Sequence, residues 1–339
     1  MVKVKYIFLI VLAVCLMGLA GCAGKTAKEA ALEKKVAELE KQVSPPKNKA
    51  PKQEEPKQEE KPVVIQVIDP ITKKELKTFT PKDLGYGTDN EKYKAEMEKW
   101  AKELARGTQT TPGYDQRMVP DHIDAGGNIV KGKPKVILEE KELLDKIMNA
   151  SQAGGSVELP LYVTDSSYKP EEVPSLGEIV VASYTTRFNS SVVGRSKNIE
   201  LSAQAINNVI LGVKDTFSFN STVGPSDMAH GYQHAPEAVD GKLVDGVGGG
   251  ICQTSSTLYN AIDKLGVAYV EKHHHSLHVG YVPTGRDATV SYGGLDFRFQ
   301  NTTGVPLLLK AYIKSGALTI EVRTSKNYQT ALKTGHVNS

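Results

Sequence analysis

The proline-rich stretch at residues 44–62 is the feature that most limits what this chain can fold into. It contains five prolines among lysine, glutamine and glutamate, and it repeats Pro-Lys-Gln-Glu-Glu at 51–55 and 56–60. A segment of this composition cannot bury enough apolar surface to fold. A globular core can therefore form only downstream of it, over about 275 residues, which suffices for two domains of ordinary size.

The N-terminal residues have the pattern of a bacterial export signal. Lys3 and Lys5 precede an uncharged stretch at 6–20, which is shorter than the roughly 20 residues that span a bilayer as a stable helix. The tetrapeptide Leu-Ala-Gly-Cys that ends at Cys22 resembles the lipobox of bacterial lipoproteins. The resemblance implies removal of residues 1–21 and a diacylglyceryl thioether on Cys22. We therefore expect a lipoprotein that is anchored to a membrane through this lipid and faces the cell wall outside it.

The segment at 26–43 has a short heptad pattern. Its apolar residues recur at spacings of four, three and four: Leu32, Val36, Leu39 and Val43. Two to three heptads rarely persist as an isolated helix in water. Weak homo-oligomerisation through this segment and a solvated spacer helix therefore both remain open. Together with the proline-rich stretch, the segment forms a lipid-anchored tether over residues 22–62.

The charge of the chain is nearly balanced. Its 42 lysines and arginines stand against 39 aspartates and glutamates, which gives a formal net charge of +3. Many of the lysines lie in the tether beside glutamates, which indicates solvation rather than a basic binding patch. We expect no nucleic-acid partner.

Residues 63–165 predict a small α/β domain. Its expected elements are two helices and a strand, at 89–106, 139–150 and 157–163. Asp89 is the candidate N-cap of the first helix, and Gly107 is expected to end it. The polar, proline-containing stretch at 164–174 predicts a connector to the next domain.

Residues 166–325 predict a second domain, of the α+β class, with an antiparallel sheet and two helices. Apolar spacings of three and four predict the helices, and alternating, β-branched patterns predict the strands. The expected helices run up to closing glycines, at about 198–211 and 252–265. The expected strands lie at 178–188, 267–272, 278–282, 288–292 and 296–299, with a hairpin at 306–323. Residues 326–339 are expected to form a flexible tail.

Cys252 is a lone cysteine at the end of a glycine run. Of the other two cysteines, Cys15 lies in the apolar part of the export signal and Cys22 is expected to carry lipid. Cys252 therefore has no partner for an internal disulfide. In an oxidising compartment an unpaired thiol is a liability unless it is deeply buried or takes part in chemistry. Cys252 is thus a candidate nucleophile, with a small apolar filler as the alternative.

The sequence before this cysteine, Gly-Gly-Gly-Ile at 248–251, leads into the second predicted helix. A glycine turn at a helix start presents several backbone N–H groups and partial positive charge at one point. This environment favours a thiolate, and it can lower the pKa of a cysteine from about 8.5 to roughly 3.5–7.5. The same N–H groups can stabilise the oxyanion of an acyl-transfer intermediate.

Four histidines follow in the segment Lys-His-His-His-Ser-Leu-His at 272–278, and Arg-Asp comes next at 286–287. A nucleophilic cysteine needs an imidazole within hydrogen-bond reach, commonly oriented by a carboxylate. On a strand, His273 and His275 would face one way and His274 the other. Zinc is the alternative for this composition, although Cys-x-x-Cys and His-Glu-x-x-His spacings do not support it. We expect neither a metal nor a cofactor.

The segment from about 178 to 310 resembles the VanW family, whose name comes from accessory proteins of vancomycin-resistance gene clusters. The resemblance is carried by an ordered series of blocks around the cysteine and the histidines. These blocks are Arg195 with Asn198-Ile199, Asp215 to Asn220 with Val223-Gly224, Gly231-Tyr232, Gly248 to Gln253, Ser255 to Asn260, His275-Ser276, Tyr281-Val282-Pro283, Gly285 to Val290, and Asp296 to Asn301. Residues 113–165 more faintly resemble the peptidoglycan-binding domain that often precedes VanW.

The resemblance implies work on peptidoglycan, and some members look like L,D-transpeptidases. Carried over, Cys252 would attack the carbonyl of the third residue of a donor stem tetrapeptide, expel the terminal D-alanine and form a thioester. An amine of a neighbouring stem would then resolve the thioester into a 3→3 cross-link. His275 would act as the base and Asp287 as its orienting carboxylate, while Arg286 would grip a substrate carboxylate or pair with a nearby acid. The remaining substrate or oxyanion positions would be Gly249, Gly250 and Gln253.

Two other functions fit the same residues. A non-catalytic, peptidoglycan-binding accessory lipoprotein would use the glycines to shape a groove, and a cysteine amidase or endopeptidase would pass the thioester to water. An unpaired thiol beside histidines favours catalysis over binding alone. Transpeptidase and hydrolase share the acylation half of the reaction, so the sequence hardly separates them. It also leaves open which histidine is the base.

Overall fold

The computed structural model describes residues 27–42, 61–239 and 242–335. The expected signal peptide, the expected lipid-attachment residue Cys22 and most of the proline-rich tether lie outside these residues. The chain divides into two compact units, at 1–60 and 61–339. Within the described ranges, no helix combines the length and the apolar character needed to pass through a bilayer.

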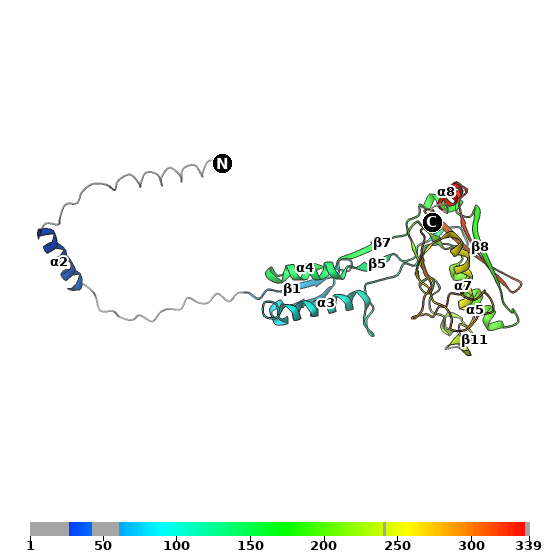
Figure 1. The fold of residues 1–339 in the computed structure, drawn as a ribbon, viewed down its shortest axis with the longest axis horizontal. Coiled ribbons are helices and arrows are strands. Elements are labelled where there is room, and N and C mark those ends of the chain that lie inside the picture. The colour runs from blue at the N-terminus through cyan, green and yellow to red at the C-terminus, as the bar shows by residue number, and fades with distance from the viewer. Residues whose placement is uncertain (1–26, 43–60, 240–241, 336–339) are drawn as a thin grey trace. The chain divides into compact units, whose positions relative to one another are not determined.

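The first unit contains the described helix α2 (Ala27–Gln42), inside the segment predicted to be helical (Figure 1). Its sequence is rich in alanine, glutamate and lysine, which are strong helix formers. The heptad residues Leu32, Val36 and Leu39 are exposed on it, at 67%, 49% and 58%. Homo-oligomerisation through this segment stays a prediction.

In the first part of the second unit, two helices pack with a small sheet (Figure 1). The sheet has the order β2-β1-β6, with β1 antiparallel to β2 and parallel to β6. These elements are β1 (Ile65–Ile68), β2 (Glu75–Phe79), α3 (Asn90–Arg106), α4 (Glu140–Ala153) and β6 (Gly155–Glu158). Asp89 caps α3, as predicted, because its carboxylate accepts a hydrogen bond from the N–H of Lys92 at 3.0 Å. Tyr93, Met97 and Leu143 are fully buried in this first core.

The strand expected at 157–163 is two strands in different sheets. β6 ends at Glu158, whereas β7 (Leu161–Thr164) pairs antiparallel with β5 (Lys135–Leu138). Pro160 lies between them, and a proline has no N–H to donate to a sheet. The single apolar run therefore changes partners at the proline.

A four-stranded antiparallel sheet and two helices form the second core. The sheet order is β8-β16-β15-β9. The elements are β8 (Ile179–Arg187), α5 (Val193–Ile206), β9 (Ile210–Leu211), α7 (Ile251–Ile262), β15 (Leu307–Lys314) and β16 (Ala317–Thr324). Alternate residues of β16, namely Leu318, Ile320 and Val322, are fully buried against the helices, which is the period of a strand with one covered face. The fold is of the predicted α+β class.

A second, three-stranded sheet completes this core. Its order is β10-β14-β13, and both pairings are antiparallel. The strands are β10 (Thr216–Ser218), β13 (Ala268–Glu271) and β14 (Arg298–Gln300), and a separate hairpin joins β11 (His234–Val239) to β12 (Lys242–Val247). Phe217 and Phe299 stack across the sheet with ring centroids 5.1 Å apart. This stacking adds to their complete burial in holding β10 beside β14.

The first helix of this core ends earlier than predicted. α5 stops at Ile206, and Ile210 lies in β9 instead of on the helix. Asn208 adopts a positive φ of 66°, a left-handed conformation that ends a helix. The helical spacing of apolar residues therefore continues past the end of α5 into β9, which is why the predicted helix was too long. The second helix, α7, is followed by a 3-10 turn and by Gly266 in the left-handed conformation, as its predicted end requires.

The two strands expected at 278–282 and 288–292 are loops. Backbone groups of this stretch bond to neighbouring side chains and loops rather than to a strand. The N–H of Ala288 donates to Ser256 Oγ at 2.9 Å, and the N–H of Thr289 donates to the carbonyl of His273 at 2.9 Å. The tertiary partners thus replace the sheet that the alternation predicted.

The C-terminal segment expected as a flexible tail contains a 3-10 turn (Lys326–Tyr328) and the helix α8 (Gln329–Gly335). Leu332 of α8 is 8% exposed and packs into the second core. A helix therefore lies within the segment expected to be a flexible tail.

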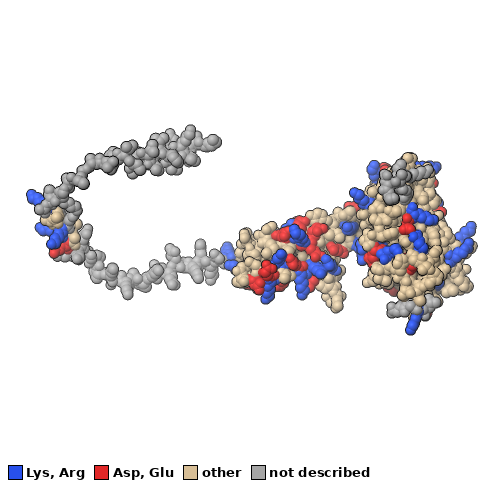
Figure 2. Space-filling model, viewed as in Figure 1, with Lys and Arg blue, Asp and Glu red and all other residues tan. Residues whose placement is uncertain are grey.

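Residues 117–130 contact the second core. The carbonyl of Asp121 accepts a hydrogen bond from the N–H of Ile210 at 2.8 Å, and Arg117 forms an ion pair with Asp296 at 2.8 Å. Ile123 also packs on a small separate cluster that contains Leu308. The surface in Figure 2 has positive and negative side chains interspersed rather than gathered by sign.

Candidate active site

The glycine run before Cys252 forms a tight turn that larger residues would not fit. Gly248 and Gly250 have φ values of 99° and 115°, in the left-handed region that favours glycine. A Cβ on Gly249 would lie 2.4 Å from the carbonyl oxygen of Ala235. The turn leads directly into α7, so the cysteine lies in the first turn of that helix, as predicted.

Asn198 of α5 fixes this turn. Its side chain is fully buried, and its Nδ2 donates to the carbonyl of Gly249 at 3.0 Å and to that of Gln233 at 2.8 Å. Its Oδ1 accepts from the N–H of Gln233 at 2.7 Å. Because a buried polar group without partners is costly, this amide favours one arrangement of the turn. α5 therefore positions the start of α7.

The Cys252 thiol is partly buried and is engaged from three sides. Sγ donates to the carbonyl of Val290 at 3.4 Å, lies 3.6 Å from Thr289 Oγ1, and is hydrogen-bonded to His275. Burial acts to raise the pKa of this thiol. The hydrogen bond and the charge of His275, with the Thr289 hydroxyl as a further donor, outweigh burial and lower the pKa below its usual value. The contacts therefore favour the thiolate.

His275 lies between the thiol and a buried carboxylate. Its Nδ1 is 2.7 Å from Asp287 Oδ2, and its backbone N–H donates to the same oxygen at 2.7 Å. Since Nδ1 binds the carboxylate, Nε2 is the ring nitrogen left for Cys252. Burial acts to lower the pKa of His275, but the interactions with Cys252 and Asp287 raise it overall. The three residues predicted as nucleophile, base and orienting carboxylate are thus adjacent in that order.

The carboxylate of Asp287 serves two histidines. His274 Nδ1 lies 2.9 Å from Oδ1, and the ring is 47% exposed. Burial acts to raise the pKa of Asp287, and hydrogen bonds from the His275 backbone and from both imidazoles hold it down at about 2. His273 binds Glu271 instead, at 3.1 Å. The predicted strand alternation fails here because β13 ends before the histidines, and the geometry selects His275 as the partner of the thiol.

A cleft of about 980 Å³ opens beside the thiol. Its lining combines the glycine turn, part of the hairpin β11–β12, the histidine loop and the loop after Ala288. The lining includes residues 247–253, 274–281 and 289–292, with Arg195, Asn220 and Glu237. A peptide-sized substrate could enter this cleft and reach Cys252.

The other predicted site residues lie around the thiol or away from it. The glycines at 249 and 250 form the turn and line the cleft. Gln253 is 1% exposed, and its amide bonds to Arg195 and to the strand β8 at Thr186 and Arg187, so its side chain supports a neighbour. Arg286 does not line the cleft; its guanidinium pairs with Asp263 at 2.8 Å, which is the structural alternative anticipated above.

Two cleft residues were missing from the predicted site. Arg195 projects from α5 to Gln253, with Nη2 2.9 Å from Oε1, and its guanidinium lies 5.9 Å from the Tyr281 ring centroid. Burial raises the pKa of Tyr281, so its phenol stays protonated. Both residues stand in the blocks that carry the family resemblance, which was the signal available in the sequence.

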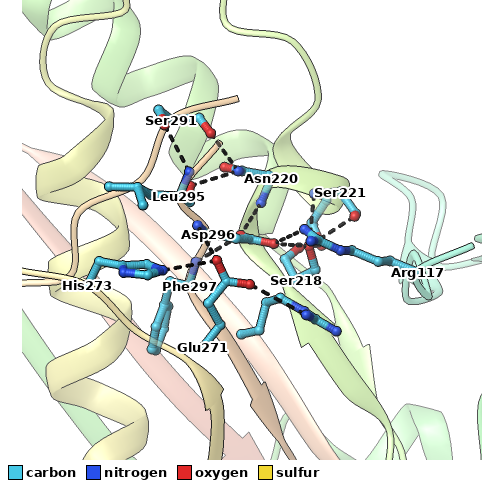
Figure 3. A network of polar contacts seen from close by, with 12 residues as sticks. Arg117, Ser218, Asn220, Ser221, Glu271, His273, Ser291, Leu295, Asp296 and Phe297 are labelled. Carbon is cyan, nitrogen blue, oxygen red and sulfur yellow. Dashed lines mark hydrogen bonds and ion pairs between the residues drawn. The ribbon is translucent and has the colours of Figure 1, made fainter. Parts of the chain in front are cut away.

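A buried carboxylate supports the cleft wall (Figure 3). Asp296 is completely buried, and its Oδ1 accepts from the N–H of Asn220 at 2.9 Å. Its Oδ2 accepts from Ser218 Oγ at 2.6 Å and pairs with Arg117 at 2.8 Å. Glu271 accepts from the backbone N–H of Asp296 at 3.0 Å. The carboxylate is thus fully compensated, as a buried charge requires.

This network reaches the cleft through Asn220. Its Nδ2 donates to the carbonyls of Ser291 and Leu295 at 2.8 and 3.0 Å, and all three residues line the cleft. Through His273, Glu271 also contacts the segment that carries the histidines, as Figure 3 shows. The wall of the cleft is therefore held by charges that never contact the thiol.

Among the residues that the structure describes, no three His, Cys, Asp or Glu side chains are grouped to hold a metal ion. His275 beside the thiol and Asp287 behind that ring are suited to acid–base chemistry.

The comparisons with known proteins place this site in a family. The model of the family described as VanW like protein matches residues 194–323, which include the thiol, the imidazole and the carboxylate. An uncharacterized protein of Bacillus subtilis, YoaR, is 39% identical over 225 residues, which cover 65% of this chain and 74% of that protein. The chain belongs to the VanW family. Vancomycin B-type resistance protein VanW of Enterococcus faecalis is 29% identical over 111 residues, or 31% of this chain and 40% of that protein.

No solved structure matches the chain. The VanW region runs from α5 to β16, so it contains both helices, three strands of the four-stranded sheet and the whole lining of the cleft, whereas β8 precedes it. The first core and the described helix α2 lie outside it.

Proposed function

We propose that this protein is a cysteine-dependent L,D-transpeptidase that cross-links peptidoglycan stem peptides. The observation that carries the proposal is the series Cys252, His275, Asp287: the first two line one cleft, and Asp287 binds His275 from behind. The pKa of the thiol is lowered and that of the imidazole is raised. Such a pair favours a nucleophilic thiolate beside a protonated imidazole that can act as the acid. Membership of the VanW family suggests a cell-wall-related protein, which directs the proposal to peptidoglycan.

The first half of the proposed reaction forms a thioester. The Cys252 thiolate adds to the carbonyl carbon between the third and fourth residues of a donor stem. The His275 imidazolium gives its proton to the leaving nitrogen, so the C–N bond breaks and D-alanine leaves as an amine. Asp287 holds Nδ1, which keeps the proton donor aligned and stabilises the charged ring.

The second half transfers the acyl group. An amine of a neighbouring stem adds to the thioester carbonyl, and neutral His275 takes the proton that this nitrogen loses. The C–S bond breaks, which returns the thiolate and the imidazolium and leaves a 3→3 cross-link. If water replaced the amine, the same residues would perform hydrolysis.

The start of α7 is suited to stabilise the oxyanion of both intermediates. N–H groups in the first turn of a helix have no acceptor within the helix. Those of Ile251 and Gln253 donate to the carbonyls of Gly248 and Gly250, at 3.2 and 3.0 Å. The N–H groups of Gly250 and Cys252 are therefore the proposed oxyanion donors.

The N-terminal sequence supports an extracytoplasmic location for this chemistry. The lipobox-like tetrapeptide would place a lipid on Cys22, and the tether would let the folded part reach the wall. Peptidoglycan stem peptides and the membrane are accordingly the proposed partners.

Product analysis tests the proposal. Purified protein is incubated with tetrapeptide muropeptides, and the products are separated and identified by mass spectrometry. We expect release of D-alanine and 3→3 dimers, both lost in Cys252→Ala. Shortened monomers alone would show a hydrolase, and binding without turnover would show the accessory protein. Unchanged products with Cys252→Ala would refute the nucleophile.

A further inference from the structure

Arg195 is the arginine of the cleft, and it differs from most other arginines of the described chain. Five of them form ion pairs with carboxylates within 4.0 Å: Arg106, Arg117, Arg286, Arg298 and Arg323. Arg187 is exposed to solvent. Arg195 is partly buried, and its guanidinium donates to neutral oxygens of Gln253 and Pro236, at 2.9 and 3.5 Å.

Among the described residues, no carboxylate lies within ion-pair distance of Arg195, and the Cys252 thiolate that acts on it is already balanced by the His275 imidazolium. Burial acts to lower the pKa of its guanidinium, and the groups that oppose this are Tyr281 and the Cys252 thiol. An arginine stays charged in proteins, and a buried charge without an opposite charge is costly. The cost is removed if an anion enters the cleft.

The side chain is held at the start of α7. A Cβ on Gly250 would lie 3.0 Å from Arg195 Cγ, so the stem of the arginine crosses the glycine two residues before Cys252. Gln253, the residue after the cysteine, binds the guanidinium. The two neighbours of the thiol along the chain thus fix this cation beside it.

Tyr281 completes the arrangement. Its ring centroid is 5.9 Å from Arg195 Cζ, within cation–π range. Because the phenol stays protonated, it adds no negative charge that would substitute for a ligand. A planar guanidinium so held presents its remaining N–H groups in a fixed fork, which fits a carboxylate by two parallel hydrogen bonds.

The geometry points to Arg195 as the binding residue for a substrate carboxylate next to the scissile bond. This inference rests on the proposed transpeptidase function and names how that site recognises its donor. The terminal carboxylate of the leaving residue is separated from the scissile nitrogen by a single carbon, so a cation beside the thiol is placed to bind it. A side-chain carboxylate on the third residue of the stem is the other source of the same chemistry. In either case the donor must be a peptide acid.

Binding to Cys252→Ala protein tests this without turnover. Calorimetry compares a stem tetrapeptide with its C-terminal carboxamide and with a tetrapeptide amidated on the third side chain. We expect one of the two amides to bind about 10- to 100-fold more weakly than the unmodified tetrapeptide acid. The position of the amide in that peptide identifies the carboxylate that Arg195 binds. Adding Arg195→Gln should lower the affinity for the tetrapeptide acid to that of the weaker amide. Arg195→Lys should lower this affinity by an intermediate amount.

Controls separate the possible failures. Arg187→Gln removes the guanidinium of an exposed arginine, whose backbone carbonyl accepts from Gln253, and should keep the preference for the acid. The thermal midpoints of this variant and of Arg195→Lys report folding. Equal binding of the acid and both amides would overturn the role of Arg195 and leave the transpeptidase proposal standing. If Arg195→Gln weakened acid and amides equally, the residue would be structural and the inference wrong. No binding of any stem peptide would overturn both proposals.

Discussion

Cys252 and His275 shift each other's titration in opposite directions. Burial alone would raise the pKa of the thiol and lower that of the imidazole, but their hydrogen bond and mutual charge reverse both effects. Both shifts favour the thiolate–imidazolium form over the neutral pair, and the pair titrates as a unit. This coupling can be measured from the reactivity of one sulfur.

His275→Gln should raise the pKa of the Cys252 thiol, because it removes the partner that favours the thiolate. The measurement is the rate of iodoacetamide labelling at Cys252 against pH, followed by peptide mass. In the wild type the midpoint should lie below the ordinary thiol value of about 8.5. His230→Gln, which changes an exposed histidine paired with Asp227, is the matched control. An unchanged midpoint in His275→Gln would refute the coupling.

Asp287 links the site to acid stability. Its pKa is about 2 in the folded chain against about 3.9 in an unfolded one, so the carboxylate contributes stability above pH 4. This contribution of about 2–3 kcal/mol is lost as the pH falls from about 4 to 2. Asp287→Asn should therefore lower the free energy of unfolding at pH 7. The difference in this free energy between the variant and the wild type should become smaller as the pH falls toward 2. Urea titration at each pH measures both. Asp83→Asn, at an exposed position, should change little. A pH-independent difference would contradict this account.

At the scale of elements, the glycine turn sets the position of α7. Gly249→Ala would put a Cβ 2.4 Å from the carbonyl of Ala235, so the turn must shift and move the thiol. We expect a loss of about 1–3 kcal/mol of stability and a larger loss of Cys252 labelling rate. Gly177→Ala is the control, because its added Cβ would contact nothing within 4 Å. A variant at 249 that labels like wild type would show that the turn does not position the cysteine.

The sequence correctly predicted those features of the fold that residues close together in the chain determine. The cap at Asp89 and the glycines around α7 follow from backbone chemistry that neighbours in sequence supply. The loops at 278–292 could not be predicted in this way, since Ser256 and His273 bond their backbone groups from distant elements. Alternation of apolar residues indicates a strand only where a ladder partner exists.

The site was predicted in part for the same reason. Residue types and the VanW resemblance indicated the thiol, imidazole and carboxylate that the structure brings together. The position of Arg195 depends on α5 crossing Gly250, a tertiary contact with no trace in local sequence. Arg286 stood in a family block as well, yet its partner Asp263 draws it away from the cleft.

At the scale of the whole molecule, Arg117 joins the segment before the β3 strand (His122–Ile123) to the second core through buried Asp296. Arg117→Gln should lower the free energy of unfolding by about 1–3 kcal/mol, because the carboxylate loses its cation. It should also speed hydrogen exchange in the loop at 291–295, which Asn220 ties to Asp296. Arg106→Gln, which breaks an exposed pair with Glu140, should cost less than about 1 kcal/mol and leave this loop unchanged. Equal effects of the two variants would refute the link.

The proposed lipid anchor at Cys22 can be tested on the full chain. If Cys22 carries the lipid, Cys22→Ser should abolish labelling by a radioactive fatty acid and move the protein from the membrane fraction to the soluble one. Cys252→Ser is the control and should retain both the label and the membrane fraction. A Cys22→Ser protein that stays in the membrane would show another anchor.

The most direct measurement of the central claim is the intact mass of the protein during turnover. A tetrapeptide donor without an acceptor is added, and the reaction is stopped in acid, where a thioester survives. The account predicts a mass gain equal to the donor stem minus its terminal D-alanine, located on Cys252 and missing from Cys252→Ala. No adduct on wild type while D-alanine is released, or the same adduct on Cys252→Ala, would contradict it.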